Sequence, residues 1–234
     1  MNTFSEAAGN AIALVAAGDP KLVGIVLLSL RVSLLAVVIG CAIGLPLGAA
    51  VAVNEFRGRR TVIVLLNALM GLPSVVVGLA VYLLLSRAGP LGSWGILFTP
   101  TAMVIAQTIL ITPTLAALSR QVVGDAWQEY REQLRSLGET KLGAVPTLLW
   151  DLRFSLMTIG LAGFGRAASE VGAVMIVGGN IDGVTRVMTT SIALETSKGD
   201  LPLALGLGFI LLSIVLALNA GAHVVKETAQ RRYC

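Results

Sequence analysis

Five runs in this chain are each long and apolar enough to cross a lipid bilayer as a helix. A helix that spans the hydrocarbon layer needs roughly 20 apolar residues. Of the 234 residues, 56% are hydrophobic and 13% are charged. A water-soluble core of this size cannot bury so much apolar surface. The sequence therefore predicts an all-α polytopic membrane protein with spans at 22–53, 61–85, 96–118, 154–177 and 203–225.

The basic residues predict how these spans are oriented, because loops that stay in the cytoplasm carry an excess of Lys and Arg. Eleven bases fall on the side of the Arg57 loop, the segment 124–153 and the C-terminus, whereas Lys21, Arg87, Arg186 and Lys198 fall on the other side. We expect five helices in one transmembrane domain at 21–225, with the N-terminus outside and a cytoplasmic tail at 226–234. An amphipathic helix on the extracytoplasmic membrane surface is expected at 1–20. The formal charge of +4 reflects this orientation, and we expect no nucleic-acid partner.

The most polar stretch, Gly124–Arg153, separates the third span from the fourth. Apolar residues recur in it at intervals of three and four, the period of a helix with one apolar face: Trp127, Tyr130, Leu134 and Leu137. Gly138 follows this run, where a C-terminal helix cap is expected. The mostly apolar segment 141–152 then leads back to the bilayer. The pattern predicts a helical hairpin on the cytoplasmic side.

Small and polar residues inside the spans predict where helices meet. Three glycines recur every four residues in the first span, which gives one face for close helix packing: Gly40, Gly44 and Gly48. Pro73 interrupts the second span and removes a backbone hydrogen bond. Arg166 and Glu170 lie four residues apart in the fourth span. We therefore expect them to pair on one helix face.

Several classes of activity lack the residues that they need. The sequence contains no Gly-x4-Gly-Lys-Ser/Thr phosphate loop, so the chain is not itself an ATPase. Cys41, Cys234 and His223 have no metal-ligand spacing, and we expect neither a metal site nor catalytic residues. The alternative class of transporter is a secondary transporter. Such a protein is expected to have buried acids for ion coupling and often inverted repeats. The sequence shows one intramembrane acid, Glu170, and no internal repeat.

The segment 132–138 resembles the EAA-type loop of ABC importer permeases, which docks on the ATPase subunit in that family. It reads Glu132-Gln133-Leu134-Arg135-Ser136-Leu137-Gly138, an acid followed six residues later by a glycine, and an apolar run follows. Three features depart from the family pattern. The two alanines of the family are Gln133 and Leu134 here, its closing Leu-Pro is Trp150-Asp151, and Pro146 falls inside the expected second helix.

Further segments resemble the permeases of the molybdate, tungstate and sulfate importers. They read Gly71-Leu72-Pro73-Ser74-Val75-Val76-Val77-Gly78-Leu79, Thr99-Pro100-Thr101-Ala102-Met103 and Phe164-Gly165-Arg166-Ala167-Ala168-Ser169-Glu170-Val171-Gly172-Ala173. Two more runs are similar to tungstate permeases in particular: Thr185-Arg186-Val187-Met188-Thr189-Thr190 and Leu194-Glu195-Thr196-Ser197-Lys198-Gly199. The resemblance covers residues 19–225.

This resemblance implies a type I ABC importer permease in a prokaryotic inner membrane. The transported oxyanion is expected to be tungstate, with molybdate and sulfate as alternatives. The expected partners are a second copy of the chain, cytoplasmic ATPase subunits that hold ATP and Mg, and an extracytoplasmic substrate-binding protein. No cofactor is expected in this chain itself.

Two sets of site residues follow from the resemblance. The ATPase contact is expected at Glu132, Gln133, Leu134, Leu137 and Gly138. The candidate translocation path consists of Arg166, Glu170, Arg186, Thr189 and Thr190. Two interpretations of Arg166 and Glu170 stay open. The pair either pins the fourth helix in the bundle or borders the path, where Arg166 meets the oxyanion transiently.

Overall fold

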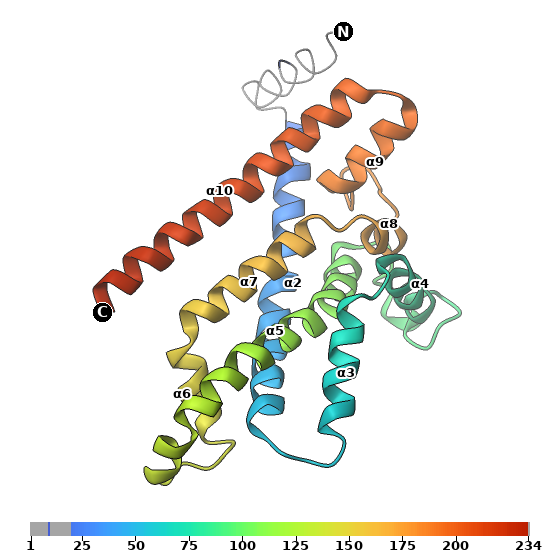
Figure 1. Ribbon diagram of the computed structural model, residues 1–234. Coiled ribbons are helices and arrows are strands. Elements are labelled where there is room, and N and C mark those ends of the chain that lie inside the picture. The colour runs from blue at the N-terminus through green and yellow to red at the C-terminus, as the bar shows by residue number, and fades with distance from the viewer. Residues whose placement is uncertain (1–8, 10–19, 234) are drawn as a thin grey trace.

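The computed structural model of the chain describes residue 9 and residues 20–233, and every regular element in them is a helix. The elements are α2 (Pro20–Val53), α3 (Arg59–Met70), α4 (Ser74–Leu85), the short 3-10 helix η1 (Gly92–Trp94), α5 (Pro100–Ser136), α6 (Ala144–Asp151), α7 (Arg153–Ala168), α8 (Gly172–Gly178), α9 (Met188–Lys198) and α10 (Leu201–Tyr233) (Figure 1). The amphipathic helix expected at 1–20 lies almost wholly outside the described residues.

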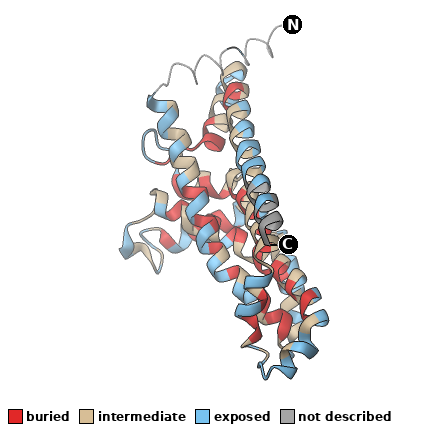
Figure 2. Cartoon of the chain, turned by 90° about the vertical axis from the view of Figure 1, so that its left-hand side faces the viewer, coloured by how far each residue is buried: buried red, intermediate tan, exposed pale blue. Residues whose placement is uncertain are grey.

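Three helices in the described part of the chain are long and apolar enough to cross a membrane on their own. They are α2, α5 and the Leu201–Gly221 part of α10. Two further pairs pass the same test together but are bent, α3 with α4 by 99° and α7 with α8 by 59°. Large apolar side chains such as Leu27, Val38 and Leu83 point outward, and exposed residues run along the helices (Figure 2). These features are those of a multi-pass membrane protein with three candidate spans, or five if each bent pair is one span.

The continuous helices expected at 61–85 and 154–177 are therefore both broken in the structure. In the first pair, Pro73 disfavours helical backbone at Leu72, so α3 ends at Met70 and α4 starts at Ser74. The break in the second pair, at residues 169–171, contains no proline. A proline in the sequence therefore indicates the break between α3 and α4, whereas no proline indicates the break between α7 and α8.

The two short helices that follow these breaks, α4 and α8, lie side by side (Figure 1). A Cβ atom added to Gly78 would lie 2.7 Å from the Cα atom of Ala173, and one added to Gly172 would lie 2.9 Å from the Ser74 hydroxyl. Glycine at both positions thus allows close contact. Buried valines of both helices complete this core together with Met103 of α5.

The longest helix, α5, joins two segments that the sequence analysis treats separately. Its 37 residues include most of the expected third span, 96–118, and the first arm of the expected hairpin. Pro100 occupies the first turn, where its missing N–H costs no helical hydrogen bond. At about 1.5 Å per residue the helix is roughly 55 Å long, well beyond the hydrocarbon thickness of about 30 Å. The hairpin arm is therefore a direct extension of a candidate span.

The glycine stripe of α2 packs against α5, as its four-residue spacing predicts. Gly40, Gly44 and Gly48 are all buried. A Cβ atom on Gly44 would lie 2.9 Å from the carbonyl oxygen of Thr112, and one on Gly48 would collide with the carbonyl oxygen of Ala116. The hydroxyl of Ser119 also donates a hydrogen bond of 2.9 Å to the Leu45 carbonyl across this contact. The prediction of a close packing surface is confirmed.

Gly48→Ala should therefore destabilise the protein, since the added methyl group meets backbone atoms that cannot rotate away. Overpacking of this kind costs about 1–3 kcal/mol. The matched control is Gly24→Ala in the same helix, where a Cβ atom has nothing within 4 Å. Thermal unfolding of the purified protein in detergent should show a lower Tm for Gly48→Ala alone. Equal midpoints for the two variants would contradict the close α2–α5 contact.

Candidate functional site

The first candidate region is the turn between α5 and α6, where Gly138 ends the long helix. Its φ of 82° is in the left-handed region that favours glycine. The Gly138 N–H donates to the carbonyl of Arg135, and the Glu139 N–H donates to that of Leu134, both at 3.0 Å. These are the two hydrogen bonds of a Schellman motif, which closes a helix C-terminus. The expected C-cap is present.

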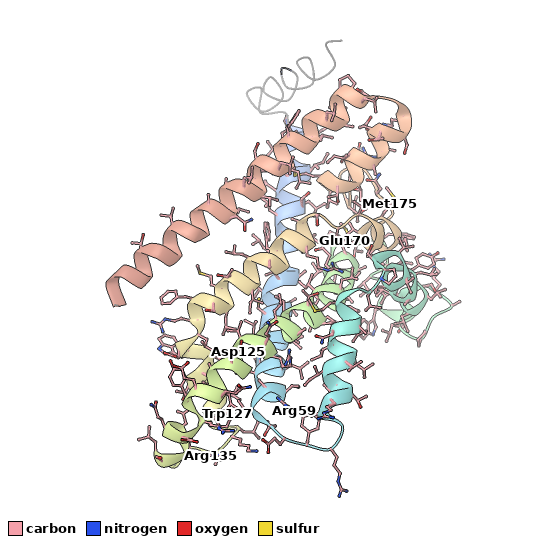
Figure 3. The ribbon with its side chains drawn as sticks, in the orientation of Figure 1. Arg59, Asp125, Trp127, Arg135, Glu170 and Met175 are labelled. Carbon is pink, nitrogen blue, oxygen red and sulfur yellow. The ribbon has the colours of Figure 1, made fainter. Side chains whose placement is uncertain are left out.

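The second arm, α6, tolerates Pro146 because of where the helix begins. Its first residue is Ala144, so Pro146 is the third residue, and the N–H of that position has no partner inside a helix. Ala144, Val145 and Leu148 are buried in one cluster with α2 and the lower part of α5, which contains Trp127 (Figure 3). Helix α6 is therefore anchored on the bundle.

Apolar side chains are exposed on the α5–α6 turn and on α6. The exposed fractions are 79% for Leu137, 63% for Leu142 and 72% for Trp150. Of the other residues expected to contact the ATPase, Glu132, Gln133 and Gly138 are exposed, whereas Leu134 packs on the buried cluster. Apolar side chains this exposed are typical of an interaction site. Leu142 and Trp150 extend the residues predicted from the sequence.

An ion pair ties this turn to the loop between α2 and α3. The Lys141 ammonium donates to the Glu55 carboxylate at 3.2 Å. That hydrogen bond, with the charge of Lys141, lowers the pKa of Glu55 below its usual value. At the end of this loop, Arg59, the first residue of α3, donates to the carbonyls of Val51 and Ala52 at 2.9 and 3.0 Å and so caps the C-terminus of α2. The α2–α3 loop and the α5–α6 turn therefore lie together at one end of the molecule.

The second candidate region surrounds the break between α7 and α8, and here the expected pairing of Arg166 with Glu170 is wrong. The helix ends at Ala168, so the two residues do not share a helix face. No ion pair joins them in the described part of the chain. The Glu170 carboxylate instead accepts a hydrogen bond of 3.1 Å from the Ala173 N–H in the first turn of α8. Arg166 lies in the last turn of α7, where the helix dipole stabilises a positive charge.

The other three expected path residues have different surroundings. The Thr189 hydroxyl donates to the Glu170 carbonyl at 2.8 Å, so the structure brings these two together. The Thr190 hydroxyl bonds to the backbone of Val187 and closes the first turn of α9. Arg186 pairs with Asp182 at 2.9 Å. The structure therefore gives Thr190 a capping role in α9 and pairs Arg186 with a residue other than Glu170 or Thr189.

Three polar residues that the expected path omits complete the cluster around Glu170 and Thr189: Ser29 and Ser33 of α2 and Gln107 of α5. Gln107 is 3% exposed, and its amide nitrogen donates to the Ala167 carbonyl at 3.0 Å. Its amide oxygen is buried with no partner in the described residues. The enclosed space is about 10 Å³, room for one water molecule. In the sequence, Gln107 stands out as a polar residue in an apolar span, whereas the two serines do not.

Several curated relatives match the chain, although no protein-family model does. The tungstate uptake system permease protein TupB of Peptoclostridium acidaminophilum is 42% identical over 97% of this chain and 100% of its own length. A probable anion ABC transporter permease protein of Haloferax volcanii is 44% identical over 90% and 93%. TupB of Campylobacter jejuni is 37% identical over 74% and 73%. The chain belongs to the family of ABC transporter permeases. Relatives named for sulfate and molybdenum transport match this permease at 28% and 27% identity.

Replacing Glu170 tests whether the permease depends on the charge of this residue or on its hydrogen bond with the Ala173 N–H. Glu170→Gln keeps an oxygen that can accept from the Ala173 N–H, whereas Glu170→Ala removes the cap, which costs about 1 kcal/mol. Thermal unfolding in detergent should show a lower Tm for the alanine variant and little change for the glutamine variant. If both variants lose the same stability, the charge of Glu170 matters, and an interaction with Arg166 would have to be reinstated.

Proposed function

We propose that this chain is the membrane-spanning permease subunit of an ATP-driven importer of tungstate. The observation that carries the proposal is the 42% identity to a tungstate uptake permease over that protein's entire length. Molybdate and sulfate are the alternative substrates, and the relatives named for them are less similar to this chain, at 24–28% identity. The protein would lie in the inner membrane of a prokaryote.

The proposed topology treats each bent helix pair as one span. Five spans put the α2–α3 loop, the α5–α6 turn and the C-terminus on one side, and these segments hold most of the bases, which supports a cytoplasmic assignment. In a variant with Cys41 and Cys234 replaced, an impermeant thiol reagent outside intact cells should label a cysteine at Ser93 and miss one at Ser136. The reverse pattern would overturn the topology.

Energy for transport would come from a separate ATPase subunit that docks on the α5–α6 turn. Exposed Leu137 and Leu142 on the turn and exposed Trp150 on the anchored helix α6 support this assignment, and Glu132 would add a charged contact. The sequence has no phosphate loop of its own. Two copies of the chain would enclose the path, and an extracytoplasmic binding protein would deliver the anion.

The closed cluster around Glu170 and Thr189 would be a constriction of that path. Its space of about 10 Å³ is far too small for an oxyanion, and the helices around it would have to separate for transport. Arg166, beside the cluster, would meet the passing anion, since its Nε atom is buried with no hydrogen-bond partner in the described residues. Two of the helices at the cluster, α7 and α8, meet at a break, where a helix bends most readily.

The substrate is tested by reconstituting the permease in liposomes with its ATPase and its binding protein. ATP hydrolysis should rise when tungstate is added, with half-maximal stimulation at a lower concentration than for molybdate or sulfate. Uptake should require ATP, which excludes a secondary transporter. Stimulation by sulfate or molybdate at lower concentrations than tungstate would reassign the substrate, and uptake without ATP would overturn the proposal.

Gly138→Val should uncouple the permease from its ATPase. A β-branched residue strains the left-handed backbone and misplaces Leu137, at a cost of about 1–3 kcal/mol. The matched control is Gly199→Val, because Gly199 has a φ of 84°, ends α9 through the same two hydrogen bonds, and has open space around it. Co-purification of the ATPase and tungstate uptake should be lost in Gly138→Val only. Normal uptake by that variant would show that the turn does not couple ATP hydrolysis to transport.

A further inference from the structure

A basic pocket of about 690 Å³ opens at the end of the molecule that holds the α2–α3 loop and the α5–α6 turn. Three guanidinium groups line it, from Arg59 of α3 and from Arg120 and Arg131 of α5. Figure 3 shows Arg59, Asp125 and Trp127 at this end of the bundle, remote from Glu170. We propose that this pocket binds a tetrahedral oxyanion. The proposal rests on the proposed function, because the transported anion would reach this pocket after crossing the membrane.

The charge around the pocket favours an anion. Two acids, Glu55 and Asp125, face the three arginines. Glu55 is already bound by Lys141 at 3.2 Å, which neutralises one of the two acids. None of the ion pairs between described residues includes Arg120, Asp125 or Arg131. A concave site with an excess of one charge concentrates ions of the opposite sign.

The donors of the pocket are partly fixed before any ligand arrives. Arg59 is held by the carbonyls of Val51 and Ala52, which use two of the five N–H groups of its guanidinium. An arginine held in this way loses less side-chain entropy when it binds a ligand. Guanidinium groups suit tetrahedral oxyanions because they donate two parallel hydrogen bonds to a pair of oxygen atoms.

Arg120 supplies the second argument for a ligand. Its Nε atom is buried and has no hydrogen-bond partner in the part of the chain that the structure describes. A buried charged donor without a partner is costly, so such groups normally have an acceptor. The amide side chains of Gln121 and Gln128 line the same pocket and add neutral donors. An oxyanion in the pocket would accept from both kinds of donor.

Binding is measured on the purified permease–ATPase complex in detergent, without binding protein or ATP, by equilibrium dialysis against tungstate and, separately, inorganic phosphate. We expect one saturable site per permease, with affinity that falls as salt is added. Arg120→Gln and Arg131→Gln should each weaken binding at least tenfold. Gln128→Glu should do the same, since it adds a negative charge without removing an arginine. Arg60→Gln is the matched control, because Arg60 is an exposed neighbour of Arg59 outside the pocket, and it should bind normally.

The two anions distinguish the source of the ligand. Tungstate bound at least tenfold more tightly than phosphate would assign the site to the transported anion, and equal affinities would assign it to tetrahedral oxyanions in general. Undiminished binding in all three pocket variants, with normal Tm values, would overturn the proposal. Binding to the isolated permease that disappears in the complex would also overturn it, because a carboxylate of the ATPase would then be the occupant. Tungstate uptake by the same variants, reconstituted in liposomes with the binding protein and ATP, tests the proposed function independently, since the permease could transport the anion without retaining it here.

Discussion

The close contact between α2 and α5 is the constraint on which the rest of the structure depends. Gly44 and Gly48 bring the backbone of α2 against that of α5. Among the described residues, each buried cluster includes residues of α5, and all but one also include residues of α2. On α5, Ala116 and Ala117 hold Leu66 of α3. Lower on the pair, Ala49 of α2 and Trp127 of α5 hold α6. A wider α2–α5 spacing would therefore displace both candidate regions together.

The break between α7 and α8 persists without proline because side chains replace the hydrogen bonds that the helix loses. In a membrane, unpaired backbone groups are costly, so a broken span needs such partners. Gln107 donates to the Ala167 carbonyl, Thr189 donates to the Glu170 carbonyl, and the Glu170 carboxylate accepts from the Ala173 N–H. Residues from α5 and α9 thus stabilise a break in a third segment. The polar cluster is first of all a structural requirement of the bent span.

These contacts also show where sequence reasoning reaches its limit. Local chemistry predicted the C-cap at Gly138 and the packing of the glycine stripe, because both depend on residues close together in the sequence. The pairing of Arg166 with Glu170 failed because it assumed a continuous helix. The break depends on partners about 60 residues earlier and 20 residues later in the chain. The basic pocket combines α3 with α5, and no spacing within either helix predicts it.

The continuity of α5 limits how ATPase movement can reach the path in the proposed transporter. One unbroken helix carries Gln107 at the closed cluster, Arg120 and Arg131 at the basic pocket, and the turn at Gly138 beyond its end. A displacement of the turn must then pass along this helix, and Pro113, between Gln107 and Arg120, marks a point where the helix bends readily because it removes a helical hydrogen bond. At the cluster the helix holds the end of α7 through the hydrogen bond from Gln107 to Ala167 and through apolar packing of Ile111 and Leu115 on α7. This contact is less extensive than the packing of α5 on α2, so it is the one that would yield first when the cluster opens.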